Sequence, residues 1–199
     1  NPDVTQYSHD VKKAAHLLRE MRYVKGDDGI FAKDGNRLEL ELLVSPDRQE
    51  FGRLAEVLKR QFEQAGIAVT TRSAEAKTLD SMLQKRRFEL ALSGHGGLGG
   101  DPEILSRMIT GKSFNSARYR RSEKLVALLS KQLRQMDRER RKKIVYEIQR
   151  IYAEEVPAVT LYHPTWYWAH DGTVDLYYTP GGLALGIPIA LNKWAFVET

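Results

Sequence analysis

Residues 38–44 alternate leucine with charged residues and then become continuously apolar, which predicts a strand that enters a buried sheet. Apolar residues at helical spacing follow and predict a helix over 51–65, closed by Gly66 as a C-terminal stop. Shorter patterns predict a strand over 67–71, a helix over 79–87 and a strand over 88–92. Strand, helix, strand, helix, strand is the order of a right-handed parallel unit. We therefore predict an α/β fold whose mostly parallel twisted sheet is flanked by helices.

The N-terminal part predicts one helix and two turns. The helix runs from the capping residue Asp10 through Met21, and its inward stripe is Val11, Ala14, Ala15, Leu18 and Met21. Turn signals follow at Asp28-Gly29 and at 34–36.

Residues 118–143 carry a strong positive charge, with eleven Lys and Arg against three Asp and Glu. One interpretation is a nucleic-acid-binding module that uses these basic helices. The apolar residues in and after this region nevertheless fall on two helical stripes, which are Leu125, Leu128, Leu129, Leu133 and Met136, then Ile144, Ile148, Ile151 and Tyr152. With Asp137 as the cap of the second helix, this spacing predicts a helical hairpin whose charges face solvent.

The C-terminal part predicts a buried strand over 157–161, followed by Tyr162, Trp166, Tyr167 and Trp168. These aromatic side chains either stack on a ligand or fill a seam between domains.

Composition excludes several classes of protein. The chain has 199 residues, a net charge of +5, 42% hydrophobic residues and no cysteine. It is too hydrophobic to be disordered, and it has no disulfide, cysteine nucleophile or cysteine-based metal site. Residues 181–191 form its longest weakly polar stretch, which is too short to span a membrane. Because the chain begins Asn-Pro-Asp without Met, we expect a processed or excised piece.

A glycine-rich segment follows the third predicted strand, with five glycines in the seven positions 94–100. Gly94, Gly96 and Gly99 fit the spacing of a dinucleotide loop, so an NADP-dependent enzyme is one alternative. The strand is the third of its unit, however, and Asp101-Pro102-Glu103 places a carboxylate where a phosphate would bind. Glycine density otherwise indicates that the backbone approaches a ligand or another domain closely.

No nucleophile paired with a base and no metal-binding spacing is visible in the sequence. We therefore expect neither an enzyme nor a cofactor or metal site.

Four segments in order resemble the C-terminal part of the bacterial extracellular solute-binding proteins of family 5. They are residues 7–23, in which Arg22 replaces the family's usual glycine; 54–69; 88–90 leading to 100–102; and Asn115 with 119–125, 137–140 and 156–162. Members of this family serve ABC importers of peptides, nickel and related solutes.

The resemblance implies a two-lobed clamp of the periplasmic-binding-protein type 2 class. Residues 1–161 would form most of the C-terminal lobe, and 162–199 a tail that returns to the missing first lobe. It implies a substrate-binding component, exported to the periplasm or cell exterior, whose partners are a small peptide-like solute and ABC permease subunits, with no nucleic acid.

The resemblance also implies which residues line the cleft, namely His95, Gly96, Gly97, Leu98 and Asn115. Peptide binders often place an Asp at the position of Leu98 to hold the peptide amine, and several relatives place Trp or Tyr in this loop where this chain has glycine. These departures weaken the case for a free-amine peptide and for a nickel complex. They also allow a bulkier or less charged solute, so the identity of the solute stays open.

Overall fold

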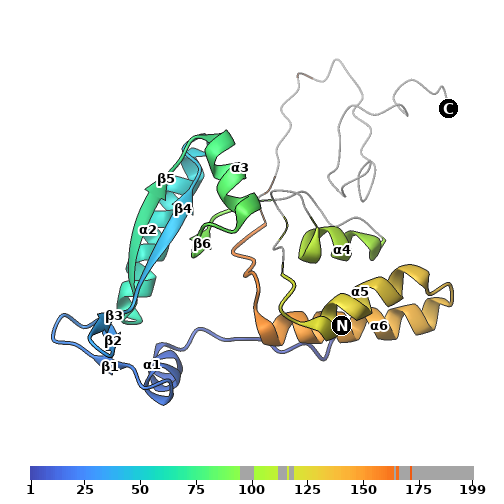
Figure 1. Ribbon diagram of the computed structural model, residues 1–199, viewed down its shortest axis with the longest axis horizontal. Coiled ribbons are helices and arrows are strands. Elements are labelled where there is room, and N and C mark those ends of the chain that lie inside the picture. The colour runs from blue at the N-terminus through green and yellow to red at the C-terminus, as the bar shows by residue number, and fades with distance from the viewer. Residues whose placement is uncertain (95–100, 112–115, 117–118, 164, 166–170, 172–199) are drawn as a thin grey trace. The chain divides into compact units, whose positions relative to one another are not determined.

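The computed structural model describes residues 1–94, 101–111 and 119–163, together with Ser116, Thr165 and Asp171. The chain divides into two compact units (Figure 1). One unit is formed by residues 7–93, and the other by residues 1–6 with the described residues from Gly94 onward. Each unit has its own core.

A parallel sheet organises the unit of residues 7–93. Its strands are β4 (Glu39–Val44), β5 (Ala68–Ser73) and β6 (Leu90–Ala91). The order is β5-β4-β6 and both pairings are parallel, with Val44 opposite Ser73 and Leu43 opposite Ala91. The predicted succession of parallel strands is therefore confirmed, although β6 is shorter than the predicted strand.

Two helices cover the sheet, α2 (Gln49–Gln64) and α3 (Ala76–Lys85) (Figure 1). Leu42 and Val44 of β4 pack in one core with Phe51 and Ala55 of α2. Leu43 packs in a separate core, with Leu79, Met82 and Leu83 of α3. Because successive strand residues point to opposite faces, α2 and α3 cover opposite faces of β4.

Helix α1 (Val11–Glu20) begins as predicted, since the Asp10 side chain accepts a hydrogen bond from the Lys13 amide at 2.8 Å. Its predicted inward stripe is only partly correct. Ala14, Ala15 and Leu18 are half-buried. Val11 and Met21 are exposed, by 36% and 57%. An apolar stripe is buried only where another element covers it, and none of the described residues covers these two positions.

A small antiparallel sheet follows α1. It consists of β1 (Val24–Lys25), β2 (Phe31–Lys33) and β3 (Asn36–Arg37) in that order. The two predicted turns connect these strands, and Asp34 and Gly35 both have positive φ, as a two-residue hairpin turn requires. The strands themselves were not predicted, because two or three residues are too few to show a period.

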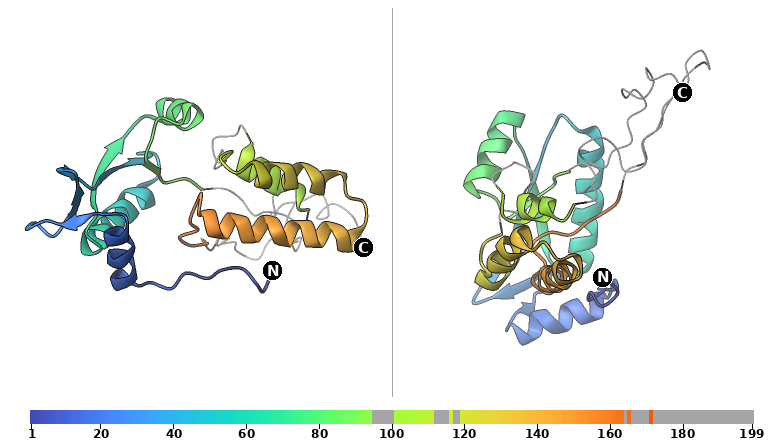
Figure 2. Two further views of the ribbon diagram at one scale, coloured as in Figure 1. Left: turned by 60° about the horizontal axis from the view of Figure 1, so that its bottom comes forward. Right: turned by 90° about the vertical axis from the view of Figure 1, so that its right-hand side faces the viewer.

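The described residues of the second unit form three helices, α4 (Glu103–Thr110), α5 (Glu123–Arg134) and α6 (Arg138–Glu155). Helices α5 and α6 lie side by side and confirm the predicted hairpin (Figure 2). The Asp137 side chain caps α6 by accepting from the Arg140 amide at 2.8 Å. The core contains Ile109, Leu125, Leu129, Ile144, Ile148 and Ile151, with Leu105, Tyr119, Leu128 and Tyr152 against it.

Two parts of the prediction for this unit are wrong. Leu133 is 47% exposed, because Gln132 takes the inward position one turn after Leu129. Met136 is 94% exposed, because α5 ends at Arg134 before it. Residues 157–161 form no strand, and Val159 is 67% exposed. An extended run becomes a strand only beside a pairing strand, and none of the described residues pairs with it.

Within the described residues, no helix combines the length and the apolar character needed to cross a membrane.

Gly66 is expected to be indispensable at the end of α2. Its φ is +84°, and a Cβ there would lie 2.6 Å from the ring of Phe31, whose side chain is 1% exposed. We expect Gly66→Ala to lower the free energy of unfolding by roughly 1–3 kcal/mol, measured by urea denaturation.

Gly52→Ala is the matched control. Gly52 lies within α2, where a Cβ meets nothing within 4 Å, so we expect this variant to be more stable by up to about 1 kcal/mol. Equal effects of the two substitutions would contradict the packing described for Gly66.

Candidate functional site

The carboxyl ends of the three parallel strands meet at one edge of the sheet. Strand β4 ends at Val44, β5 at Ser73 and β6 at Ala91. Ligands of parallel α/β sheets bind beyond this edge. The chain leaves it through Ser93, which is exposed, and Gly94, which is half-buried. The glycine segment, residues 94–100, therefore starts at the edge where a ligand is expected.

All of the predicted cleft residues, His95, Gly96, Gly97, Leu98 and Asn115, lie outside the described residues. Their role stays a prediction. The structure does describe the chain on both sides of them, and these flanking residues form a defined polar arrangement.

Asp101, which directly follows the glycine segment, is held by two hydrogen bonds. Its Oδ1 atom accepts from the Glu103 amide at 2.7 Å and from Nη2 of Arg141 at 2.8 Å. The first bond confirms the predicted carboxylate at the start of α4. The Glu103 hydrogen bond, and after it Arg141, lowers the pKa of the Asp101 carboxyl. The carboxylate is therefore ionised and paired at neutral pH.

Gln132 connects the start of α4 to the core of the second unit. Its side chain is fully buried, and Nε2 donates to the Pro102 carbonyl at 3.3 Å and to Oγ of Ser106 at 3.5 Å. Its Oε1 accepts from Nε of Arg141 at 3.1 Å. We call the set of Asp101, Pro102, Ser106, Gln132 and Arg141 the Asp101 network. It fixes the first turn of α4 to both α5 and α6.

Sequence reasoning missed this network. One signal was present, because Gln132 continues the helical spacing of Leu125 and Leu129 and so occupies a core position. Nothing in the sequence indicated that Arg141 and Asp101, forty positions apart, would form an ion pair.

The segment that contains Asn115 is also anchored at its flanks. The Tyr119 amide donates to the Ile109 carbonyl at 2.8 Å, and Nη2 of Arg120 donates to the Thr110 carbonyl at 2.9 Å. Hydrogen bonding to Glu155 raises the pKa of the Tyr119 phenol. A Cβ on Gly111 would overlap the Arg107 carbonyl oxygen, so glycine is required where the chain leaves α4.

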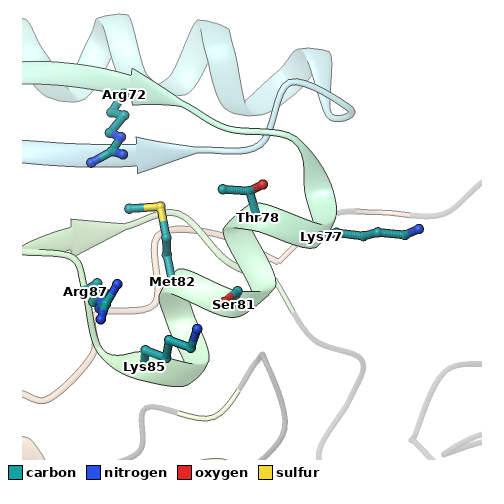
Figure 3. Close-up of a pocket in the computed structure, with 7 residues that line it drawn as sticks. All are labelled: Arg72, Lys77, Thr78, Ser81, Met82, Lys85 and Arg87. Carbon is teal, nitrogen blue, oxygen red and sulfur yellow. The ribbon is translucent and has the colours of Figure 1, made fainter.

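A separate hollow lies beside α3 (Figure 3). Its volume is about 580 Å³, and it is lined by Arg72, Lys77, Thr78, Ser81, Met82, Lys85 and Arg87. Four of these seven side chains are cationic and none is acidic. One of the four, Arg72, pairs with Glu41 at 3.5 Å, so the positive charge beside the hollow is partly neutralised within the protein.

Among the described residues, no three His, Asp or Glu side chains stand close enough together to hold a metal ion.

Several basic side chains of the helical hairpin are engaged in ion pairs. Lys124 contacts Glu147 at 2.7 Å, and Arg150 contacts Glu154 at 2.9 Å. Charge in this region is thus partly neutralised within the protein.

Comparisons with known proteins agree with the predicted family. Residues 1–117 match the model of the family described as bacterial extracellular solute-binding proteins, family 5 Middle. The di/tripeptide-binding protein 4 of Pseudomonas aeruginosa is 26% identical over 182 residues, which are 89% of this chain and 32% of that protein. The chain therefore spans about a third of the length of this curated relative.

Solved structures agree on the fold. NikZ from Campylobacter jejuni, in complex with Ni(L-His), matches with a TM-score of 0.69 and 24% identity, covering 79% of this chain and 32% of NikZ. The oligopeptide binding protein from Thermus thermophilus, complexed with a pentapeptide, matches with a TM-score of 0.64 and 26% identity, covering 79% of this chain and 30% of that chain. The predicted fold class, a lobe of a type 2 periplasmic binding protein, is confirmed.

These relatives are binding proteins rather than enzymes. The matches give no support to the NADP-dependent enzyme or to the nucleic-acid-binding module.

The lowered pKa of Asp101 predicts a dependence of stability on pH. A carboxyl with a lower pKa in the folded chain stabilises the fold when ionised, so its contribution is complete above the unfolded pKa and is lost as the pH falls through the folded pKa. We expect the difference in unfolding free energy between the parent and Asp101→Asn to shrink below about pH 4, measured by urea denaturation. Asp47→Asn, in an exposed turn, controls for the loss of one negative charge. A difference that stays constant down to about pH 2.5 would contradict the pairing of Asp101.

Gln132 is expected to be needed for the stability of the second unit. Gln132→Leu leaves the Pro102 carbonyl, Ser106 and Arg141 without their buried partner, which costs about 1–3 kcal/mol. Thermal unfolding measures this loss. Gln61→Leu, on the exposed side of α2, should change stability by less than about 0.5 kcal/mol. Equal thermal midpoints of Gln132→Leu and Gln61→Leu would contradict a stabilising role of the Asp101 network.

Proposed function

The chain belongs to the bacterial extracellular solute-binding proteins of family 5, and from that premise we propose that it is part of the substrate-binding component of an ABC-type importer. In this proposal the protein captures a peptide or similar small solute between two lobes. Residues 1–161 are most of the C-terminal lobe, and residues 162–199 return to the first lobe. The protein acts outside the cytoplasm and delivers its solute to permease subunits.

The observation that carries this proposal is the match of the family model to residues 1–117, which include the parallel sheet and the whole glycine segment. The similarity to a di/tripeptide-binding protein supports a peptide-like solute. The position of the glycine segment after β6 supports a ligand at the carboxyl edge of the sheet.

The proposed mechanism is closure of two lobes on the solute. Only the closed form makes both sets of contacts, so the solute shifts the population toward that form. From this lobe, His95, Gly96, Gly97, Leu98 and Asn115 contribute the contacts. The glycines offer backbone N–H and C=O groups without steric obstruction.

The charge of the proposed site favours a solute that does not depend on a free amine. Position 98 carries leucine instead of an acid. Asp101, the next carboxylate along the chain, already pairs with Arg141 at 2.8 Å. A bulkier or less charged solute fits these features better than a short cationic peptide does.

Solute capture is tested with the complete gene product that contains this chain. Native mass spectrometry of the protein from its producing cells should show a bound small solute. Isothermal titration with trialanine and with its N-acetylated form should show binding. The acetylated form should bind at least as tightly, because position 98 offers no carboxylate to pair with a free amine.

The isolated chain serves as the control. It lacks the contacts of the other lobe, so its affinity should be weaker by at least about tenfold, or about 1.4 kcal/mol. Equal affinity of the isolated chain and the complete protein would overturn the two-lobe mechanism. The absence of any bound or titrated solute in the complete protein would overturn the proposed function.

A further inference from the structure

The turn that joins α5 to α6 exposes apolar side chains at the end of the helical hairpin (Figure 2). Helix α5 ends at Arg134 and α6 begins at Arg138, so residues 135–137 make the turn. Met136 in this turn is 94% exposed, and Leu133 in the last turn of α5 is 47% exposed. Neither side chain belongs to the core of the unit. Packing within the unit therefore does not account for these two apolar residues.

The same end of the hairpin carries unpaired positive charge. Three exposed arginines flank the turn, namely Arg134, Arg138 and Arg140. Among the described residues, none of these three forms an ion pair. Two acidic residues lie in the same stretch, Asp137 and Glu139, and Asp137 is engaged as the cap of α6. Residues 131–143 hold seven Lys and Arg against these two acids, so a net positive charge remains.

This charge does not stabilise the helix that carries it. The first turn of a helix is the positive end of its dipole, so cationic side chains there are unfavourable. Arg138 and Arg140 lie in the first turn of α6. A partner that gains from these arginines must therefore carry negative charge.

A lipid surface with anionic headgroups matches both features of this end of the hairpin. Its phosphate groups attract arginine side chains, and the boundary between headgroups and acyl chains accepts apolar side chains without a preformed pocket. An acidic protein surface would also attract the arginines, but it would need a matching pocket for Met136, which projects almost fully into solvent. The combination favours a lipid surface over an acidic protein.

We propose that the hairpin tip, which consists of Leu133, Arg134, Met136, Arg138 and Arg140, docks on the surface of a membrane that contains anionic phospholipids. The three arginines contact phosphate groups, and Leu133 and Met136 enter the boundary between headgroups and acyl chains. The contact is reversible, because only two apolar side chains enter the lipid. This docking goes beyond the proposed function and does not depend on solute capture.

The test measures how the complete gene product, purified without attached lipid, binds to vesicles. One set of vesicles contains equal parts of phosphatidylglycerol and phosphatidylcholine, and the other contains phosphatidylcholine alone. Sedimentation of the vesicles at low ionic strength gives the partition coefficient. We expect binding to the anionic vesicles only. About 1 M salt, which shortens the Debye length to about 3 Å, should release the protein.

Charge variants test the arginines of the hairpin tip. Arg134→Gln/Arg138→Gln/Arg140→Gln should weaken binding to the anionic vesicles at least about tenfold, because each arginine near the lipid surface adds to the attraction. The matched control removes the same charge from exposed positions on α1 and α2, as Lys12→Gln/Arg53→Gln/Arg60→Gln. The control should bind within about twofold of the parent, because its three residues lie outside the hairpin tip.

A single substitution tests the apolar contact. Met136→Ser should weaken binding about three- to tenfold, because the thioether side chain no longer leaves water when the protein docks. Met21→Ser is the matched control, since Met21 is 57% exposed and lies outside the hairpin tip, and it should bind like the parent. The thermal midpoint of each variant should stay near that of the parent, because all of the substituted side chains are exposed.

Four results would overturn the inference. They are equal binding to the two sets of vesicles, equal binding of the two triple variants, equal binding of Met136→Ser and Met21→Ser, and binding only to phosphatidylcholine vesicles that carry the permease subunits. The last of these would identify an acidic protein surface as the partner. If the parent binds trialanine but neither set of vesicles, this inference falls and the proposed function stands.

Discussion

Strand β4 is buried on both of its faces, and the architecture of its unit follows from this constraint. Leu42 and Val44 require an apolar partner on one side, which α2 supplies, and Leu43 requires one on the other side, which α3 supplies. Because helices cover both faces of β4, its hydrogen-bonding neighbours lie on either side of it within the sheet. These neighbours are β5 and β6, and both pair with β4 in parallel. Because all three strands then point the same way, their carboxyl ends share one edge, and the glycine segment leaves from it.

The second unit is organised by a polar constraint inside an apolar core. Gln132 is fully buried between helices, so each of its polar atoms needs a partner. Pro102, Ser106 and Arg141 provide them, and they tie α4 to the α5–α6 hairpin. The same contacts bring Arg141 to Asp101. The buried Gln132 side chain on α5 therefore helps to hold the first turn of α4 in place.

The sequence alone determined the parallel unit, the caps at Asp10 and Asp137, and the glycine stop at Gly66. Each of these depends on local spacing or on the conformation of one residue, and a linear pattern records both. The short strands β1 to β3 escaped prediction because they contain too few residues to show a period.

Only the tertiary structure decided which apolar positions are covered. Met136 and Val159 look like core residues in the sequence but are exposed, since burial depends on what lies opposite. Only the tertiary structure could bring Asp101 to Arg141 and Gln132, because their contact depends on how three helices pack and not on any feature within one of them.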